Sequence, residues 1–446
     1  MTAENGSEVI AKIPCPDVVP SRSSTASEAA LLNYVRSKAS VPVPKVLSWS
    51  SESSNGVRSE YIVMKKADGI QLVDVWGDMD QIQRFQLIKD LARLETELAS
   101  LKFAACGSLY FCDSPDAKRQ IIPINKRYGI GPVYNASWFP HCGNEAHAGP
   151  WTNLSELGIG LANRGLAHIQ DSPLTPRGPH FGTRADHIRL LHSAKKVIAK
   201  FAHFPPLHRF SRPILWHGDL HLGNIFVARE DPTTIVRIID WQFISIMPAF
   251  MQSQWPTFLR PPENYTFGLV KPDLPPNFET MDDDEKAFAE SERDQALLAK
   301  CYEVVLAKRC PEAYAAWTKV DSPIRDLFSL VDRTCKDGVV PLRDALIRIS
   351  EVWDQMGFEG PCPYQPTDDD LARHTLELAR YKDWHTLKGY TQELLRTDDD
   401  GWVNPQLDFH KVRARHDELF QLYMERETEV ISEEEGKSLW FYIDRP

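Results

Sequence analysis

The sequence predicts an α+β protein in which short strands come first and the C-terminal half is mainly helical. Short apolar segments, separated by prolines and a Ser-rich loop, fill the first 66 residues. Apolar residues at helical spacing run through most of residues 284–428. Between these parts, a polar loop at 217–224 precedes the apolar strand Ile235–Ile239, which ends on Asp240.

The first 66 residues are expected to form the end of a small β-rich lobe. A strand at Ser7–Ile13 is stopped by proline. A helix at Thr25–Arg36 opens on a capping-box pattern, Thr25 with Glu28. Two further strands are expected at Val43–Trp49 and Tyr61–Met64.

The remaining elements follow from apolar periodicity and from Gly and Pro breakers. The polar residues 65–69 mark the boundary after the first lobe, and residues 106–180 are expected to be irregular. The runs of three aspartates at 282–284, 368–370 and 398–400 are expected at solvated helix starts or loops. Helices are expected at 80–101, 185–203, 284–310, 311–319, 323–334, 340–356, 367–395 and 407–428.

Composition narrows the classes of function. The 446 residues are 42% hydrophobic and 25% charged, and the net charge of −11 argues against a nucleic-acid binder. The eight cysteines show neither Cys-x-x-Cys pairs nor zinc spacing, which favours reduced thiols. No apolar run reaches membrane-spanning length, and the N-terminus lacks the pattern of a signal or transit peptide.

A polar loop carries the strongest functional signal. Residues 217–224 read His-Gly-Asp-Leu-His-Leu-Gly-Asn, which places Asp219 and Asn224 five apart, and Asp240 closes the next apolar strand. Phosphoryl transfer from ATP needs a carboxylate facing the acceptor hydroxyl, and an amide and a carboxylate that hold magnesium on the phosphates. Protein kinases place these groups in a His-Arg-Asp loop, an Asn five residues on, and an Asp past a hairpin. Here Gly218 replaces the Arg, and Trp241-Gln242 replaces Phe-Gly.

This loop resembles the catalytic loop of the aminoglycoside phosphotransferase-like (phosphotransferase enzyme) family, which has the protein-kinase-like fold. Several phrases are similar to the fungal branch around the altered inheritance of mitochondria proteins. These phrases are Val41–Val46, Tyr61–Met64, Gly107–Tyr110, Ile130–Pro132 and Ile239–Gln242. The resemblance implies a bilobal fold, with a partial nucleotide lobe at 1–66, a C-lobe core at 67–262 and a helical extension at 263–446.

The resemblance also implies roles for single residues. Asp219 would be the catalytic base, and Asn224 and Asp240 would hold Mg²⁺. Lys12 would meet the α and β phosphates of ATP, with Glu28 as its ion-pair partner. The backbone of Met64, Lys65 and Lys66 would bind adenine. His217 would support the active-site backbone, and His221 is expected to make a structural hydrogen bond.

In one respect the sequence departs from the family's pattern. A kinase-like lobe opens with a strand, a Gly-rich loop over the phosphates and a second strand. Only eleven residues precede Lys12. We therefore expect a truncated lobe without the Gly-rich loop, which binds nucleotide weakly and leaves a strand edge unpaired. A mitochondrial targeting segment would belong to the missing part.

The sequence thus predicts an ATP- and Mg²⁺-dependent phosphotransferase acting on an unidentified hydroxyl-bearing small molecule. The acceptor is expected to lie against the helical lobe and residues 106–180. The alternative is a pseudokinase-like binding or assembly module with a vestigial site. A protein Ser/Thr kinase fits less well, because His-Gly-Asp replaces His-Arg-Asp and no Asp-Phe-Gly is present. The expected location is a reducing intracellular compartment, either the cytoplasm or the mitochondrion.

Overall fold

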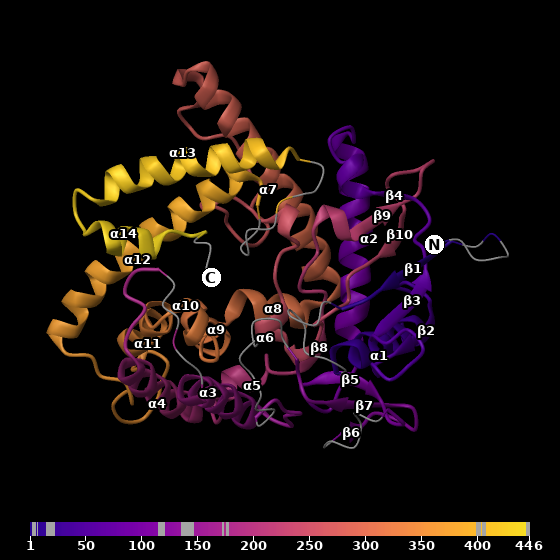
Figure 1. The fold of residues 1–446 in the computed structure, drawn as a ribbon, viewed down its shortest axis with the longest axis horizontal. Helices are drawn as coiled ribbons and strands as arrows, with labels where there is room; N and C mark the ends of the chain where they lie inside the picture. Colours follow the sequence, from indigo (N-terminus) through magenta and orange to yellow (C-terminus); the bar gives the residue numbers. More distant parts are fainter. Residues whose placement is uncertain are drawn as a thin grey trace. The chain divides into compact units, whose positions relative to one another are not determined.

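The computed structural model describes residues 1, 6, 8–14, 23–114, 121–134, 147–171, 174, 178–397, 403 and 407–442 (Figure 1). Contacts between residues divide the chain into two compact units. The first comprises Met1–Leu161 and Ala199–Arg325, and the second comprises Ala162–Ile198 and Asp326–Pro446. The lobe boundaries expected at residues 66 and 262 remain predictions.

The first sheet of unit 1 carries the predicted strand lysine. It has the antiparallel order β1-β3-β2, formed by β1 (Val9–Lys12), β3 (Tyr61–Lys65) and β2 (Val46–Ser50). Lys12 pairs with Ile62. Strand β1 lies at the edge of this sheet, and at Val9 the edge is covered by Met1, which exchanges two backbone hydrogen bonds with it.

Helix α1 (Ser23–Lys38) follows this strand and is almost entirely buried through its first three turns. It begins two residues before Thr25, so the capping-box expectation for Thr25 and Glu28 was wrong. Glu28 instead points its carboxylate at Lys12, 3.0 Å away. The Lys12 ammonium donates to this buried carboxylate in a charge-assisted hydrogen bond.

A second sheet connects the loop at 217–224 with the strand that precedes Asp240. Its antiparallel order is β10-β9-β4, formed by β10 (Ile235–Ile238), β9 (Ile225–Val227) and β4 (Ile70–Gln71). Strand β9 begins directly after Asn224, and β10 ends two residues before Asp240. Gly69 has a φ of +107° before β4, and a Cβ there would lie 2.2 Å from Val227 O, so this close crossing requires glycine.

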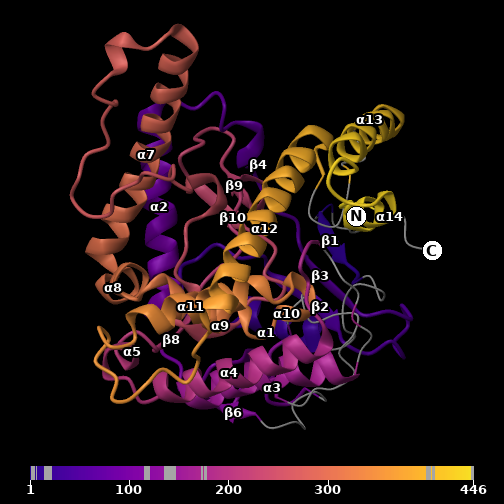
Figure 2. The same ribbon diagram turned by 90° about the vertical axis from the view of Figure 1, so that its left-hand side faces the viewer.

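Two long helices of unit 1, α2 (Gln81–Ser100) and α7 (Asp283–Arg309), lie side by side in both views (Figures 1 and 2). Each begins with a complete capping box, Asp80 with Gln83 and Asp282 with Glu285. The aspartate run at 282–284 is therefore a helix start, as predicted. Unit 1 also contains β5 (Ser108–Phe111), β6 (Ile122–Pro123), β7 (Tyr128–Gly131), β8 (Pro213–Leu215), β11 (Ile246–Pro248), α5 (Pro205–His208), α6 (Ala249–Gln252) and α8 (Pro311–Lys319).

Residues 106–180 are more regular than expected. Besides β5, β6 and β7 they contain helix α3 (Leu154–Asp171). Glycine has low intrinsic helix propensity, so the glycines of α3 weakened the sequence pattern from which a helix is predicted. They serve close packing instead: a Cβ at Gly160 would lie 2.4 Å from Trp151 Nε1, and one at Gly165 would lie 2.8 Å from Val331 O.

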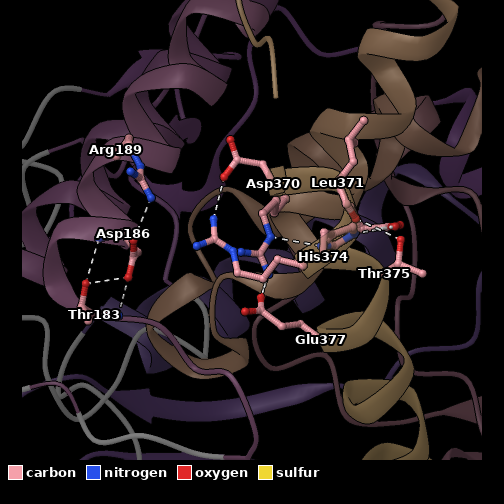
Figure 3. Close-up of polar contacts among 11 residues, drawn as sticks. Thr183, Asp186, Arg189, Asp370, Leu371, His374, Thr375 and Glu377 are labelled. Carbon is pink, nitrogen blue, oxygen red and sulfur yellow. Dashed lines mark hydrogen bonds and ion pairs between the residues drawn. The ribbon is translucent and has the colours of Figure 1, made fainter. Parts of the chain in front are cut away.

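Unit 2 is helical in its described residues. The aspartate run at 368–370 begins helix α12 (Asp368–Leu395), as predicted, and the Thr367 hydroxyl accepts from Asp370 N within a capping box. On that helix His374 and Glu377 lie close together (Figure 3), and both receive hydrogen bonds from Arg343. A short final helix was not expected; it packs through Trp440 against Tyr423 and Met424. The helices wholly or partly in this unit, besides α3, are α4 (Arg184–Phe201), α9 (Ser322–Leu330), α10 (Thr334–Asp337), α11 (Val340–Val352), α12 (Asp368–Leu395), α13 (Phe409–Glu427) and α14 (Glu433–Leu439).

The aspartate run at 398–400 lies outside the described residues. Among the described residues, no helix has the length and apolar character needed to cross a membrane.

Candidate functional site

The catalytic-loop motif forms a tight loop between β8 and β9. Asn224 is 5% exposed, and its Nδ2 donates a hydrogen bond to Asp219 O at 3.0 Å. This bond spans the loop and leaves the Asp219 side chain exposed to solvent. The loop therefore presents one carboxylate outward while its backbone is closed from within.

The strand end that carries Asp240 is attached to this loop through both backbone groups of Ile239. Ile239 N donates to Asn224 O at 2.9 Å, and Nε2 of His217 donates to Ile239 O at 3.0 Å. The ring of His217 also packs edge-on against Trp241, with 4.8 Å between centroids. His217 thus holds the backbone next to Asp240, and its role at an active site remains a prediction.

Asp240 has the left-handed backbone conformation, with a φ of 60°. Asp and Asn tolerate this conformation better than other non-glycine residues. The turn ends the strand sharply, and the Asp240 side chain is 47% exposed. Its carboxylate is therefore accessible. The neighbouring backbone is held by the bonds of Ile239 and by Trp241 Nε1, which donates to Ile238 O at 2.9 Å.

Lys12 connects this strand end to helix α1. Its Nζ lies 3.0 Å from both carboxylate oxygens of Glu28 and 3.1 Å from Asp240 Oδ1. The Glu28 side chain is 5% exposed. Burial disfavours the charged ammonium, but the two carboxylates outweigh it and raise the pKa of Lys12. Lys12 is therefore a cation shared by two acids, and burial raises the pKa of Glu28.

The residues expected to bind adenine are placed differently from one another. Met64 is buried in the core, whereas the ammonium groups of Lys65 and Lys66 pair with Asp68 and Glu8. The backbone N–H of Lys65 donates to Lys45 O, and that of Lys66 donates to Glu8 O. Adenine recognition at this segment would thus use its carbonyl groups or the following residues, and the role remains a prediction.

His221 makes a local bond. Its Nδ1 accepts from Gly223 N at 3.1 Å and caps the short 3₁₀ turn Leu222–Asn224. This is a structural hydrogen bond of the kind expected for His221, and its role at the site remains a prediction.

Two glutamines support the loop that sequence reasoning did not identify. Gln71 Nε2 donates to Gly223 O at 2.9 Å, and Gln254 Nε2 donates to Gly218 O at 2.6 Å. Neither residue lies in a recognisable motif, because a side-chain amide can reach a distant carbonyl from many positions in the sequence. No sequence signal could have found them.

The residues present fit a magnesium ion. Asp219 O can only accept, so the Asn224 amide must turn its nitrogen inward, which leaves its Oδ1 as the ligand atom. An amide oxygen and the Asp240 carboxylate are ligands that Mg²⁺ accepts, with phosphates and water completing the shell. Among the described residues, no group of three or more His, Cys, Asp or Glu could hold a metal alone. Such a site would therefore depend on the nucleotide for the rest of its ligands.

A strand lysine paired with a helix glutamate, a catalytic loop and a strand-end aspartate together define a phosphotransferase-like protein of the kinase-like class. The chain belongs to the phosphotransferase enzyme family, whose sequence profile matches residues 1–251. This membership confirms the predicted resemblance. Together with the elements described above, it also confirms the predicted α+β, protein-kinase-like fold class.

Individual relatives are more distant. The chain is 27% identical over 492 residues to a subtelomeric hrmA-associated cluster protein of Aspergillus fumigatus, covering 100% of this chain and 94% of that protein. It is 22% identical over 399 residues to altered inheritance of mitochondria protein 9, mitochondrial, of Kluyveromyces lactis, covering 80% of this chain but 63% of that protein. A solved structure, aminoglycoside phosphotransferase APH(2'')-Ib, ADP-bound, is similar over 75% of this chain and 88% of its own, at 12% identity and a TM-score of 0.31.

Proposed function

We propose that the protein is an ATP-dependent phosphotransferase that phosphorylates a hydroxyl group of a small molecule. The observation that carries the proposal is the position of Lys12, which contacts Glu28 and Asp240 together. A cation held between these two acids is the arrangement that kinases use to place the nucleotide phosphates beside the metal. The bonds from Ile239 to Asn224 and His217 support the same conclusion, since they join the strand end to the catalytic loop.

In this proposal each residue has one task. Asp219 accepts or orients the proton of the acceptor hydroxyl, and Lys12 positions the phosphates. Asn224 Oδ1 and Asp240 hold Mg²⁺, which when bound supplies positive charge to the β and γ phosphates. Catalysis by such a site is mostly positioning and electrostatic stabilisation.

Location is part of the proposal. We expect a reducing compartment, because the six cysteines of the described residues are free thiols. The relative named mitochondrial supports the mitochondrion over the cytoplasm.

The test separates binding from catalysis. Ligand binding to the native state raises its melting temperature by mass action, so Mg-ATP should raise that of the wild-type protein. Asp240→Asn keeps the left-handed backbone but weakens the metal site, and should abolish the shift. Asp219→Asn should keep the shift and lose about 10²–10⁴-fold in turnover, measured in an acceptor screen with labelled ATP.

Each outcome is informative. Full turnover by Asp219→Asn on an identified acceptor would refute the assigned base. The absence of any magnesium-dependent shift at millimolar ATP would favour the binding-module alternative. In that case the search would turn to protein partners.

A further inference from the structure

We propose that residues 253–268, here called the brace, fix the catalytic loop in its working geometry, and that Gln254 is the positioning residue through which they act. This inference extends the proposed function, in which the loop carries the base. Gln254 Nε2 donates to Gly218 O at 2.6 Å, and Thr257 N donates to Leu220 O at 2.8 Å. These two carbonyls belong to the residues immediately before and after Asp219.

The carbonyl of Asp219 itself accepts from Asn224 Nδ2 at 3.0 Å. Three consecutive carbonyls of the loop, at residues 218, 219 and 220, are therefore each held by a hydrogen bond. Because these groups orient the peptide planes on both sides of Asp219, its backbone cannot rotate without breaking at least one of them. The position of the carboxylate is set by the brace as much as by the loop.

The brace is attached firmly to helices α7 and α8 by aromatic packing. The ring of Trp255 lies 4.4 Å from that of Trp317 on α8 and 5.6 Å from that of Tyr302 on α7, measured between centroids. It also lies 5.7 Å from Tyr265 and 6.0 Å from Phe267, both within the brace. Such clusters add to burial through edge and stacked contacts between rings. The residue next to Gln254 thus makes ring contacts with both helices.

A buried carboxylate fixes the far end of the brace. Glu303 on α7 accepts from the Tyr265 hydroxyl, from Gly268 N at 2.6 Å and from Tyr314 on α8 at 2.7 Å, and it pairs with Lys300 at 2.6 Å. In the middle of the brace, Gln295 Nε2 donates to Phe258 O at 3.0 Å. The brace is therefore fixed at its start, its middle and its end.

The contacts of the brace bear on how the proposed site is controlled. In protein kinases the segment after the metal-binding aspartate switches between ordered and disordered states, often on phosphorylation. Here the corresponding part of the chain is held by hydrogen bonds and ring packing to helices α7 and α8. These contacts hold the loop in one geometry, and misplacement of Asp219 by about 1 Å would cost on the order of 100-fold in rate.

The experiment compares two glutamines. Gln254→Met removes the amide that holds Gly218 O, and since Gln254 is exposed the fold should tolerate the change. Gln252→Met is the matched control, because Gln252 Nε2 donates to Ser245 O at 2.7 Å and not to the catalytic loop. Amide hydrogen exchange of a peptide covering residues 217–224 is measured in both variants and in the wild type. We expect exchange about 3–10-fold faster in Gln254→Met, and no change in Gln252→Met.

Turnover gives a second readout. Gln254→Met should lower kcat about tenfold and leave the KM for Mg-ATP unchanged, and in the Asp219→Asn background it should cause no further loss. Unchanged loop exchange in Gln254→Met, or equal acceleration in both variants, would overturn the inference. A wild-type protein without turnover would refute the proposed function, and the exchange result would still decide the role of the brace.

Discussion

At the scale of single residues, His217 is a histidine that is almost completely shielded from solvent. Its side chain is buried, and burial lowers the pKa of His217. The ring is neutral near pH 7, and its Nε2 proton is committed to Ile239 O. His217 therefore acts as a fixed hydrogen-bond donor beside Asp240 and not as a proton carrier.

This position predicts a pH effect on stability. The pKa of His217 is lower in the folded state, so its contribution is present above the ordinary value of about 6.5 and is lost as the pH falls through the folded value. His217→Phe should lower the free energy of unfolding by about 1–3 kcal/mol at pH 7.5, because Ile239 O loses its partner. It should also flatten the decline below pH 6.5. Urea unfolding between pH 5 and 8 tests this, with exposed His203→Phe as the control; the same pH dependence in wild type and His217→Phe would contradict it.

The sequence named candidate site residues but not their supports. Asp219, Asn224 and Asp240 were singled out by type and spacing, and Lys12 and Glu28 by the family resemblance. The structure brings Lys12 together with Glu28 and Asp240, and their roles remain predictions. The supports at Gln71 and Gln254 reach backbone carbonyls across 152 and 36 positions of the chain, and such contacts impose no spacing rule. Sequence motifs indicate candidate catalytic and metal-binding residues, but they do not indicate the residues that support them.

At the scale of secondary-structure elements, the packing of α2 against α7 buries an acid without a cation. Glu95 is fully enclosed, and its carboxylate accepts from Tyr302 at 2.6 Å. Burial raises the pKa of Glu95 to about 8. The folded state thus keeps this proton at neutral pH, which is the reverse of the usual behaviour of a paired carboxylate.

Glu95 stabilises the folded state more at low pH than at high pH. Because the folded pKa exceeds the unfolded value of 4.5, the contribution of Glu95 to stability is complete below pH 4.5 and is lost as the pH rises to about 8. Glu95→Gln has no proton to lose, so at pH 8 and above it should be more stable than the wild type by about 1–4 kcal/mol. Melting temperatures from pH 5 to 9 test this, and Glu290→Gln, at an exposed position of α7, is the control. A less stable Glu95→Gln at pH 9 would contradict the prediction.

Elements were predictable where caps and periodicity agree. The bounds expected for α8 match those observed, and those of α2, α7 and α12 agree within a residue, because proline or capping residues mark the helix starts. Helix α3 was missed because its glycines, which let Trp151 and Val331 approach, reduce the helical signal. The local sequence indicates only the intrinsic helix propensity of this segment, and tertiary packing stabilises the α3 helix in spite of its low propensity.

At the scale of the whole molecule, the described site residues fall in one compact unit. Lys12, Glu28, His217, Asn224 and Asp240 all belong to unit 1. Residues 162–198 join 326–446 in unit 2, and no local pattern indicates such grouping of distant segments. The sequence could therefore predict the order of elements but not which of them associate.

This division predicts that stability and nucleotide binding can be changed separately. Arg343 in unit 2 pairs with Glu377 and donates to His374, and all three side chains are largely buried. Arg343→Met should lower the stability of this unit by about 2–4 kcal/mol, since it leaves a buried carboxylate unpaired. The Kd for Mg-ATP should stay within about twofold of wild type in calorimetric titration. Loss of nucleotide binding in this variant, with Arg373→Met as an exposed control, would contradict the independence of the site.

The left-handed backbone at Asp240 affects how this position can vary under selection. Selection for folding alone would admit Gly and Asn, which tolerate positive φ, and would reject β-branched residues. Selection for magnesium-dependent nucleotide binding would keep Asp. In a library randomised at this codon, a screen for soluble expression and a screen for nucleotide capture would therefore retain different amino acids. At position 240 the residues required for folding and those required for nucleotide binding can therefore be measured separately.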